Sequence, residues 1–412
     1  MNRDITKFKK FYKSLDKDKK MLYWVLVSSS LIILIFLIKL IFNGYFIVGN
    51  SLQMEATGQF GDFIGGVVGT IFSGLGFYFL YLTLVDQRIS ISNQNDAITN
   101  QKDAFEKERF EAKFFDLIKL HRDNIIDEKY NIYIDGEKIA LEGRKVFNAI
   151  YKEFQECLAE VKRFCKIYDS SNCVKHDYKI KLNQIKKANN LQTTVEELAL
   201  IDIAYTILFY GIGREGQILV KQKFLKKYND DFCFKLIRFM QLKPSKKFTT
   251  EYSSWVKFKN YKISDLKIAF EEIFKNRNKE HFQYIIDGNN MVDNYSKIKY
   301  YGGHQHRLGH YYRHLFQTYK FLFLQNSIND EEKYFYGKTL RAQLSNYEQA
   351  LLFVNSISSL GYKWELDCDY SKDSKPMRLI TYFQLIKNVS GRRFVDLDYR
   401  DFYKKIKYEF EE

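Results

Sequence analysis

Helix breakers and paired cysteines are scarce in this chain. Its 412 residues include two prolines, Pro244 and Pro376, and five cysteines without a Cys-x-x-Cys pair. So few prolines, together with long mixed apolar and charged stretches, predict a mostly helical protein. The scattered cysteines indicate reduced, buried hydrophobic side chains rather than a Cys-x-x-Cys site.

Three motifs of common enzyme classes are also missing: a Walker A loop, Gly-x-Ser-x-Gly and His-Glu-x-x-His. Residues 211–216, GIGREG, do match the Gly-x-Gly-x-x-Gly pattern of dinucleotide sites. That fingerprint requires a strand before it, whereas the apolar run before Gly211 has a helical pattern. We therefore interpret these glycines as turns at a helix end, and no cofactor is predicted.

Charge is nearly absent from two long apolar runs near the N-terminus. Residues 21–42 contain one charged side chain, Lys39, and residues 63–85 contain none. At about 1.5 Å per helical residue, each run is long enough to cross a hydrocarbon core of about 30 Å. Because a soluble chain rarely has two such runs in succession, we predict two transmembrane helices at these positions.

The charges around the two runs predict their orientation. Residues 1–20 form a basic segment, the connecting residues 43–62 contain no cation, and cations return after Val85. The positive-inside rule then places both termini in the cytoplasm and makes residues 43–62 an external loop. The alternative is a cleaved signal peptide, but the first run is too long and lacks a small-residue cleavage site after it.

Small residues recur every four positions in the second apolar run. Such spacing lets helix backbones approach closely in lipid. Two uses remain open, packing against the first run or association between copies of the chain. The small residues form two rows: Gly65, Gly69 and Ser73, and Gly66, Thr70 and Gly74.

The rest of the chain falls into two predicted parts. Residues 86–130 are predicted to form a stalk helix that becomes amphipathic towards its end and can pair with a neighbouring copy. Residues 131–412 are predicted to form a helical cytoplasmic effector or sensor domain, with one helix over residues 333–360. The fold class is therefore mainly α: a two-helix transmembrane hairpin, a long stalk helix and an all-α cytoplasmic domain.

Four of the seven histidines fall within one eleven-residue stretch. His304 and His306 precede His310 and His314, which share a helical face. This spacing is compatible with a metal site, but no nearby carboxylate completes a ligand set, so no metal is predicted. Six residues separate Arg307 from His314, which resembles the Arg-x4–6-His signature of HEPN ribonucleases. The structural interpretation, a helix N-terminus with packed polar residues, is favoured over both a metal site and a ribonuclease site.

A second polar segment lies at residues 340–348, LRAQLSNYE. On a continuous helix Arg341, Ser345 and Glu348 would share one face. Such a face indicates a buried polar network or a ligand site, and the alternative is an ordinary solvated surface.

Five segments, taken in order, resemble the AbiC-like phage abortive infection family of bacteria. The family pattern, an aromatic pair before an Arg and a Leu-Ser followed by a Glu, corresponds to Tyr311, Tyr312 and Arg313 and to Leu344, Ser345 and Glu348. The resemblance implies an anti-phage defence protein linked to the bacterial inner membrane and implies no reaction. The segments are GQFGDFIGGVVGTIFS at 58–73, FFDLIKLHRDNI at 114–125, LFYGIG at 208–213, GHYYRHLFQ at 309–317 and LRAQLSNYEQALLF at 340–353.

Three functions follow from these observations. The leading hypothesis is a membrane-anchored defence protein that senses infection and triggers growth arrest or death. The second is a membrane-tethered, metal-independent ribonuclease that uses Arg307 or Arg313 with His310 or His314. The third is a non-enzymatic membrane scaffold or sensor. The expected partners are the lipid bilayer, other copies of the chain, an unidentified phage trigger and RNA, to which the net charge of +15 is suited.

Overall fold

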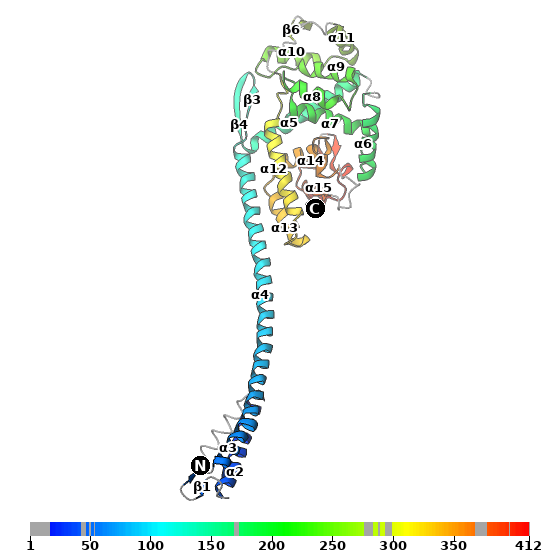
Figure 1. Ribbon diagram of the computed structural model, residues 1–412. Coiled ribbons are helices and arrows are strands. Elements are labelled where there is room, and N and C mark those ends of the chain that lie inside the picture. The colour runs from blue at the N-terminus through cyan, green and yellow to red at the C-terminus, as the bar shows by residue number, and fades with distance from the viewer. Residues whose placement is uncertain are drawn as a thin grey trace. The chain divides into compact units, whose positions relative to one another are not determined.

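A computed structural model describes most of the chain (Figure 1). It divides into two compact units, Met1–Ala104 (unit 1) and Phe105–Glu412 (unit 2). Most of the predicted basic segment, and part of the predicted external loop, lie outside the described residues. The described residues are 17–42, 47–48, 51–52, 54–168, 173–275, 283–286, 289–292, 299–366, 377–394 and 396–411.

Unit 1 contains the two apolar runs. Helix α2 (Lys17–Phe42) is followed by a short antiparallel pair, β1 (Ile47–Val48) and β2 (Ser51–Leu52), and then by α3 (Met54–Phe63). A π-helical turn at Ile64–Val68 leads into α4 (Gly69–Ile126). By length and composition, two helical stretches among the described residues are apolar enough to cross a membrane, Leu22–Lys39 and one within Gly58–Ile126.

The second apolar run begins earlier in the structure than its sequence predicts. Helix α3 starts at Met54 rather than at Phe63, so the predicted loop over residues 43–62 is shorter. Good helix formers and an acidic side chain at Glu55, in the first turn, favour this earlier start despite two glycines inside the helix. Phe36 of α2 stacks on Phe63, with ring centroids 4.2 Å apart.

Helix α4 passes from unit 1 into unit 2. All its side chains from Asp86 to Glu106 are exposed. Further on, one face becomes buried in unit 2, and the helix ends at Ile126 rather than at residue 130. The buried side chains recur at helical spacing and are Phe110, Phe114, Ile118, His121 and Ile125.

A β-hairpin follows α4, and the all-helical prediction for residues 131–412 missed it. Strand β3 (Lys129–Ile134) pairs antiparallel with β4 (Glu137–Glu142) through the turn Asp135-Gly136. Both turn residues have positive φ, 50° and 86°, which the Asp-Gly dipeptide tolerates. The mainly helical character of the chain is nevertheless confirmed.

The core of unit 2 forms around α5 (Arg144–Ile167), α7 (Val195–Tyr210) and α14 (Asn346–Ile357), which contact one another. Almost every side chain of α7 is buried, as its apolar sequence requires. In Figure 1, α9–α11 gather at one end of unit 2 and α12–α15 at the other. The remaining elements are α6 (His176–Asn189), α8 (Gly216–Phe224), α9 (Asp230–Gln241), α10 (Thr249–Lys259), α11 (Ile263–Lys275), β5 (Gln283–Ile286), β6 (Asn289–Val292), α12 (Gln305–Phe323), α13 (Asp330–Arg341), η3 (Tyr362–Trp364), α15 (Leu379–Tyr382), β7 (Arg393–Phe394), β8 (Leu397–Asp398), η4 (Tyr399–Asp401) and η5 (Glu409–Glu411).

The helix predicted over residues 333–360 is in fact two helices. Helix α13 ends at Arg341 and α14 begins at Asn346. Ser345 is the N-cap of α14: its hydroxyl accepts from the Glu348 N–H, while the Glu348 carboxylate accepts from the Ser345 N–H at 2.8 Å. This reciprocal capping box starts a new helix where the sequence pattern alone indicated continuity.

Candidate functional site

A groove of about 1,110 Å³ opens where three segments of unit 2 meet. The first segment joins the end of α7 to α8, the second leads into and along α12, and the third follows α14. Its lining residues are Phe209, Tyr210, Gly213, Arg214, Glu215, Gly216, Leu219, Gly302, Gly303, Gln305, His306, Leu308, Gly309, His310, Tyr312, Arg313, Phe316, Asn355, Leu360, Gly361, Lys363 and Trp364.

Two glycine loops cross at one end of the groove. Gly211 has φ of 76°, and a Cβ there would lie 2.6 Å from the backbone of Gly302. The loops are joined by hydrogen bonds from the Ile212 N–H to the Tyr301 carbonyl (3.0 Å) and from the His304 N–H to the Phe209 carbonyl (2.9 Å). Because α7 precedes Gly211, the interpretation of GIGREG as a helix end is confirmed. Backbone crossing, not dinucleotide binding, explains why glycine stands at position 211.

The groove is predominantly cationic. Arg214, His310, Arg313 and Lys363 are exposed along it, and Glu215 is its one carboxylate among the described lining residues. In the part of the chain that the structure describes, the cationic side chains of Arg214, Arg313 and Lys363 form no ion pair. Their charge is therefore available to an anionic ligand.

The floor of the groove is held by hydrogen bonds from buried groups. Asn355 accepts from the indole N–H of Trp364 at 3.1 Å and donates its amide to the Tyr205 hydroxyl at 2.9 Å. The Ser358 hydroxyl donates to the Asn355 carbonyl at 2.8 Å. These contacts fix the segment that carries Lys363 into the groove.

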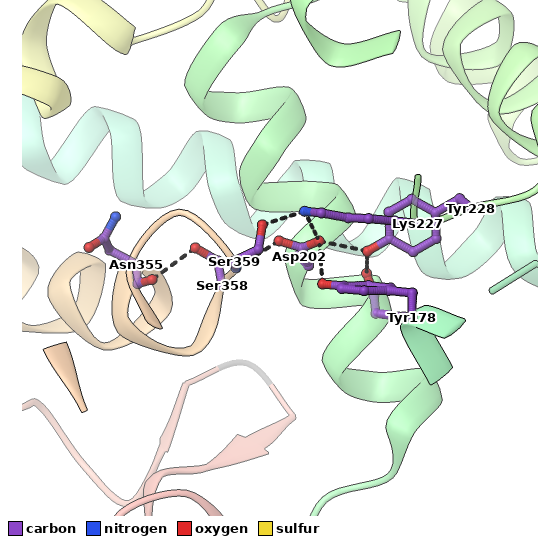
Figure 2. A network of polar contacts seen from close by, with 8 residues as sticks. Tyr178, Asp202, Lys227, Tyr228, Asn355, Ser358 and Ser359 are labelled. Carbon is purple, nitrogen blue, oxygen red and sulfur yellow. Dashed lines mark hydrogen bonds and ion pairs between the residues drawn. The ribbon is translucent and has the colours of Figure 1, made fainter. Parts of the chain in front are cut away.

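Figure 2 shows the buried network that continues from this floor. Asp202 on α7 is fully buried and accepts hydrogen bonds from the Tyr178 hydroxyl (3.1 Å), the Tyr228 hydroxyl (2.7 Å) and the Lys227 ammonium (2.9 Å). Its other oxygen accepts from the Ser359 N–H at 2.8 Å. One carboxylate thus joins α6, α7, the segment before α9 and the loop after α14.

The charge of Asp202 is stabilised where it lies. Burial alone would raise its pKa, but the Lys227 cation and the hydrogen bonds from Ser359 and Tyr228 outweigh this effect, so the pKa lies below its ordinary value. Asp202 is therefore ionised at neutral pH and anchors the loop below the groove.

The structure separates the four predicted catalytic candidates into two pairs. His310 and Arg313 line the groove and are exposed. Arg307 instead donates from Nε to the Lys129 carbonyl (2.9 Å), and His314 donates from Nε2 to the Leu117 carbonyl (3.1 Å). The pair with Arg-x4–6-His spacing is thus directed at β3 and α4.

The four clustered histidines point in three directions. His304 is buried, with Nε2 at 3.1 Å from the Glu153 carboxylate, which also accepts from the Tyr130 hydroxyl at 2.9 Å. His306 and His310 face the groove, and His314 faces α4. Burial lowers the pKa of His306, with a smaller contribution from the Arg307 cation. Among the described residues, no group of three or more His, Cys, Asp or Glu is placed to hold a metal.

The residues of the second polar segment do not form one face. Glu348 is fully buried and accepts from the Ser345 hydroxyl (2.5 Å) and, on its other oxygen, from the Tyr311 hydroxyl (2.8 Å). Arg341 donates from one nitrogen to the carbonyls of Phe383 (3.0 Å) and Gln384 (3.1 Å). Glu348 thus connects α14 to α12, whereas Arg341 holds the chain after α15.

Arg214, Lys363 and Trp364 are among the groove residues that the sequence did not reveal. Arg214 lies inside the GIGREG segment, where only the glycines form a recognisable pattern. Lys363 and Trp364 carry no motif, and only the fold brings them beside α12.

Together, fold and site define a class of protein. It is mainly helical, with two apolar helical stretches and a basic groove. Within it, residues 303–394 match the family described as "Putative phage abortive infection protein". The match confirms the resemblance over this segment, which is less than a quarter of the chain and includes the pieces at 309–317 and 340–353. The other three pieces lie outside it. No curated protein and no solved structure matches the chain.

Proposed function

We propose that this protein is a membrane-anchored phage-defence protein whose helical unit 2 senses infection and triggers growth arrest or death. It acts at the bacterial inner membrane, with two spans and both termini in the cytoplasm. The single observation that carries the defence role is the family match at residues 303–394. The membrane role is supported by the two apolar helical stretches and the charges that flank them.

Exposed apolar side chains support the membrane anchor. Leu31 and Ile35 on α2, and Phe72, Phe77 and Leu80 on α4, are about half exposed or more. An aqueous surface with so many large apolar groups is unfavourable, at roughly 25 cal/mol per Å², whereas lipid tails accommodate it.

Association between copies is a further part of the proposal. A Cβ at Gly65, Gly66, Gly69 or Gly74 would meet no atom within 4 Å among the described residues, so these glycines are open to a neighbouring helix. Leu84, Ile91 and Ile98 extend the surface along α4 at seven-residue spacing and are all exposed.

Metal-independent RNA cleavage is a second candidate, supported by the exposure of His310 and Arg313 in one basic groove. Histidine can transfer protons at neutral pH, and arginine can bind a scissile phosphate. The contacts of Arg307 and His314 with backbone carbonyls give these two residues packing roles instead.

The defence proposal is tested by phage plaquing on cells that express three forms at equal abundance. These are the full chain, a form lacking residues 17–85, and a form in which an unrelated two-span anchor replaces those residues. We expect protection by the full chain and none by the truncated form. Protection by the form with the unrelated anchor would assign the hairpin a tethering role alone.

Two outcomes contradict parts of this proposal. Equal protection by the truncated form would show that membrane attachment is unnecessary. Absence of protection by the full chain against a broad phage panel would remove the defence role. The second candidate, RNA cleavage, is tested on cellular RNA isolated during infection. Intact RNA in protected cells would contradict cleavage.

A further inference from the structure

We infer that the groove of unit 2 binds a nucleotide, with its phosphates against Arg214, Arg313 and Lys363 and its base against the apolar lining. This inference does not depend on the membrane or defence roles. It rests on charge, backbone geometry, shape and rigidity.

Charge is the first step. Arg214 lies before α8, Arg313 lies on α12, and Lys363 follows α14, so three separate segments bring cations to one groove. In the described part of the chain none of them is neutralised by an ion pair. An ordinary surface mixes both signs of charge, whereas this lining has a single carboxylate, Glu215. The lining therefore favours a polyanionic ligand.

Backbone geometry is the second step. A Cβ at Gly213 would meet no atom within 4 Å, so the backbone at this position is open to the groove. Helix α8 begins at Gly216 and α12 at Gln305, and both residues line the groove. Phosphate oxygens can therefore approach backbone N–H groups closely, at ends of helices that favour negative charge.

The apolar lining is the third step, and it distinguishes a nucleotide from inorganic phosphate. Tyr210 and Phe316 are partly exposed in the groove, together with Leu219 and Leu360. Every nucleobase has a flat face that stacks on such rings. A volume of about 1,110 Å³ lies slightly above the range of ~300–1,000 Å³ that is typical of pockets for small ligands, so the groove has room for a nucleotide.

Rigidity is the fourth step. The loop that carries Lys363 is held through Asn355 and Ser359, and Ser359 is bound to the buried Asp202 carboxylate (Figure 2). A site fixed before the ligand arrives loses less conformational entropy on binding. The network in the core thus gives the groove a preformed shape.

The experiment measures binding to the purified full chain in detergent by isothermal titration calorimetry. The probes are ATP, GTP, CTP and UTP, together with adenosine and tripolyphosphate, which separate the contributions of base and phosphate. We expect at least one nucleoside triphosphate to bind with micromolar affinity, at least tenfold more tightly than tripolyphosphate, with adenosine weaker still. Affinity should fall as salt rises.

Variants then locate the site. Arg313→Gln and Arg214→Gln should each weaken nucleotide binding about tenfold or more, because a charged hydrogen-bond donor is lost. Arg122→Gln is the matched control, since Arg122 is exposed on α4 and does not line the groove. Glu215→Gln should tighten binding a few-fold, because it removes the carboxylate nearest the phosphates. Thermal unfolding confirms that each variant is folded.

Several outcomes would overturn the inference. No binding of any of the four nucleotides at 1 mM (a concentration of about the usual upper limit for weak specific binding) excludes the site. Equal affinity for tripolyphosphate and nucleotides replaces it with a phosphate site. Binding of single-stranded RNA alone, lost in Arg313→Gln, replaces it with an RNA surface, and unaltered nucleotide binding in both Arg variants places the ligand elsewhere. Each result is independent of plaquing, so failure here leaves the defence proposal standing.

Discussion

At the scale of single residues, His121 is the most unusual buried group of unit 2. It lies on the inner face of α4, fully buried, with its ring 5.4 Å from Tyr311 and 6.0 Å from His314. Neither ring nitrogen has a hydrogen-bond partner among the described residues. Burial lowers its pKa from 6.5 to about 4, with smaller contributions from His314 and Arg144. His121 is therefore neutral in the folded protein at pH 7.

We expect His121→Leu to reduce the loss of stability in acid. Below pH 6.5 the unfolded chain binds a proton at His121 that the folded chain does not, so folding weakens as pH falls towards 4. This proton binding lowers the free energy of unfolding by about 2.5 kcal/mol at a pH of roughly 4.5. Leu, which is similar in volume, abolishes the effect. Urea unfolding of the full chain in detergent, followed by tryptophan fluorescence at pH 7 and at a pH of roughly 4.5, measures this loss of stability.

His176→Leu is the matched control, because His176 is exposed at the start of α6. It should leave the difference between the two pH values unchanged. If His121→Leu also left that difference unchanged, the ring of His121 would be protonated, or solvated, in the folded state.

Residue roles on α12 show how far sequence reasoning reaches. Successive residues of an α-helix are rotated by about 100°. This rotation places His306, His310 and Arg313 on a different face from Arg307 and His314, so two polar faces could be predicted. Which face is open depends on α4, β3 and the loop after α14, and no local pattern specifies these neighbours. The capping box at Ser345 and Glu348 was predictable, because Ser-x-x-Glu is a known helix start.

At the scale of elements, the loop crossing at Gly211 is the feature that shapes the groove. The backbone there has positive φ and lies against Gly302. Gly213, two residues later, has no atom within 4 Å of a Cβ position and does not have positive φ. Gly211 is therefore required by the loop crossing, whereas Gly213 is not.

Gly211→Ala should destabilise unit 2 by about 2–4 kcal/mol, because the methyl group would strain the backbone and push the two loops apart. Gly213→Ala should change stability by no more than about 0.5 kcal/mol. Chemical unfolding of both variants beside the wild-type chain tests this. Equal stability of the two variants would mean that the crossing is loose enough to accept a side chain.

Element boundaries were predicted less well than element types. The apolar runs, the stalk and the helix before Gly211 follow from composition and helical period, and the structure has helices at each. The hairpin at β3–β4 was missed although two signals for it were available. Tyr130, Ile132 and Ile134 alternate along β3, and an Asp-Gly turn follows.

At the scale of the whole molecule, α4 is the covalent connection between the two units. It is an uninterrupted helix from Gly69 to Ile126, and its side chains from Asp86 to Glu106 make no packing contact that buries them. If infection sensed by unit 2 is to change helix packing in the membrane, a rigid α4 is the element that can transmit the change. We therefore expect coupling to depend on helix continuity rather than on polar side chains such as Asn93 in the exposed stretch.

Asn93→Pro tests this expectation, because proline in a helix interior costs ~3 kcal/mol and kinks or breaks the helix locally. Asn93 is exposed and lies outside both the apolar run and the buried part of α4, so membrane insertion, folding and nucleotide binding should be retained. Protection against phage should be lost. Asn93→Ala, which keeps the helix, should protect as the wild-type chain does. Plaquing with membrane-fraction blots, beside nucleotide titration of the purified variants, measures all three properties. Full protection by Asn93→Pro would show that a flexible tether suffices, and unit 2 would then act without a mechanical signal through α4.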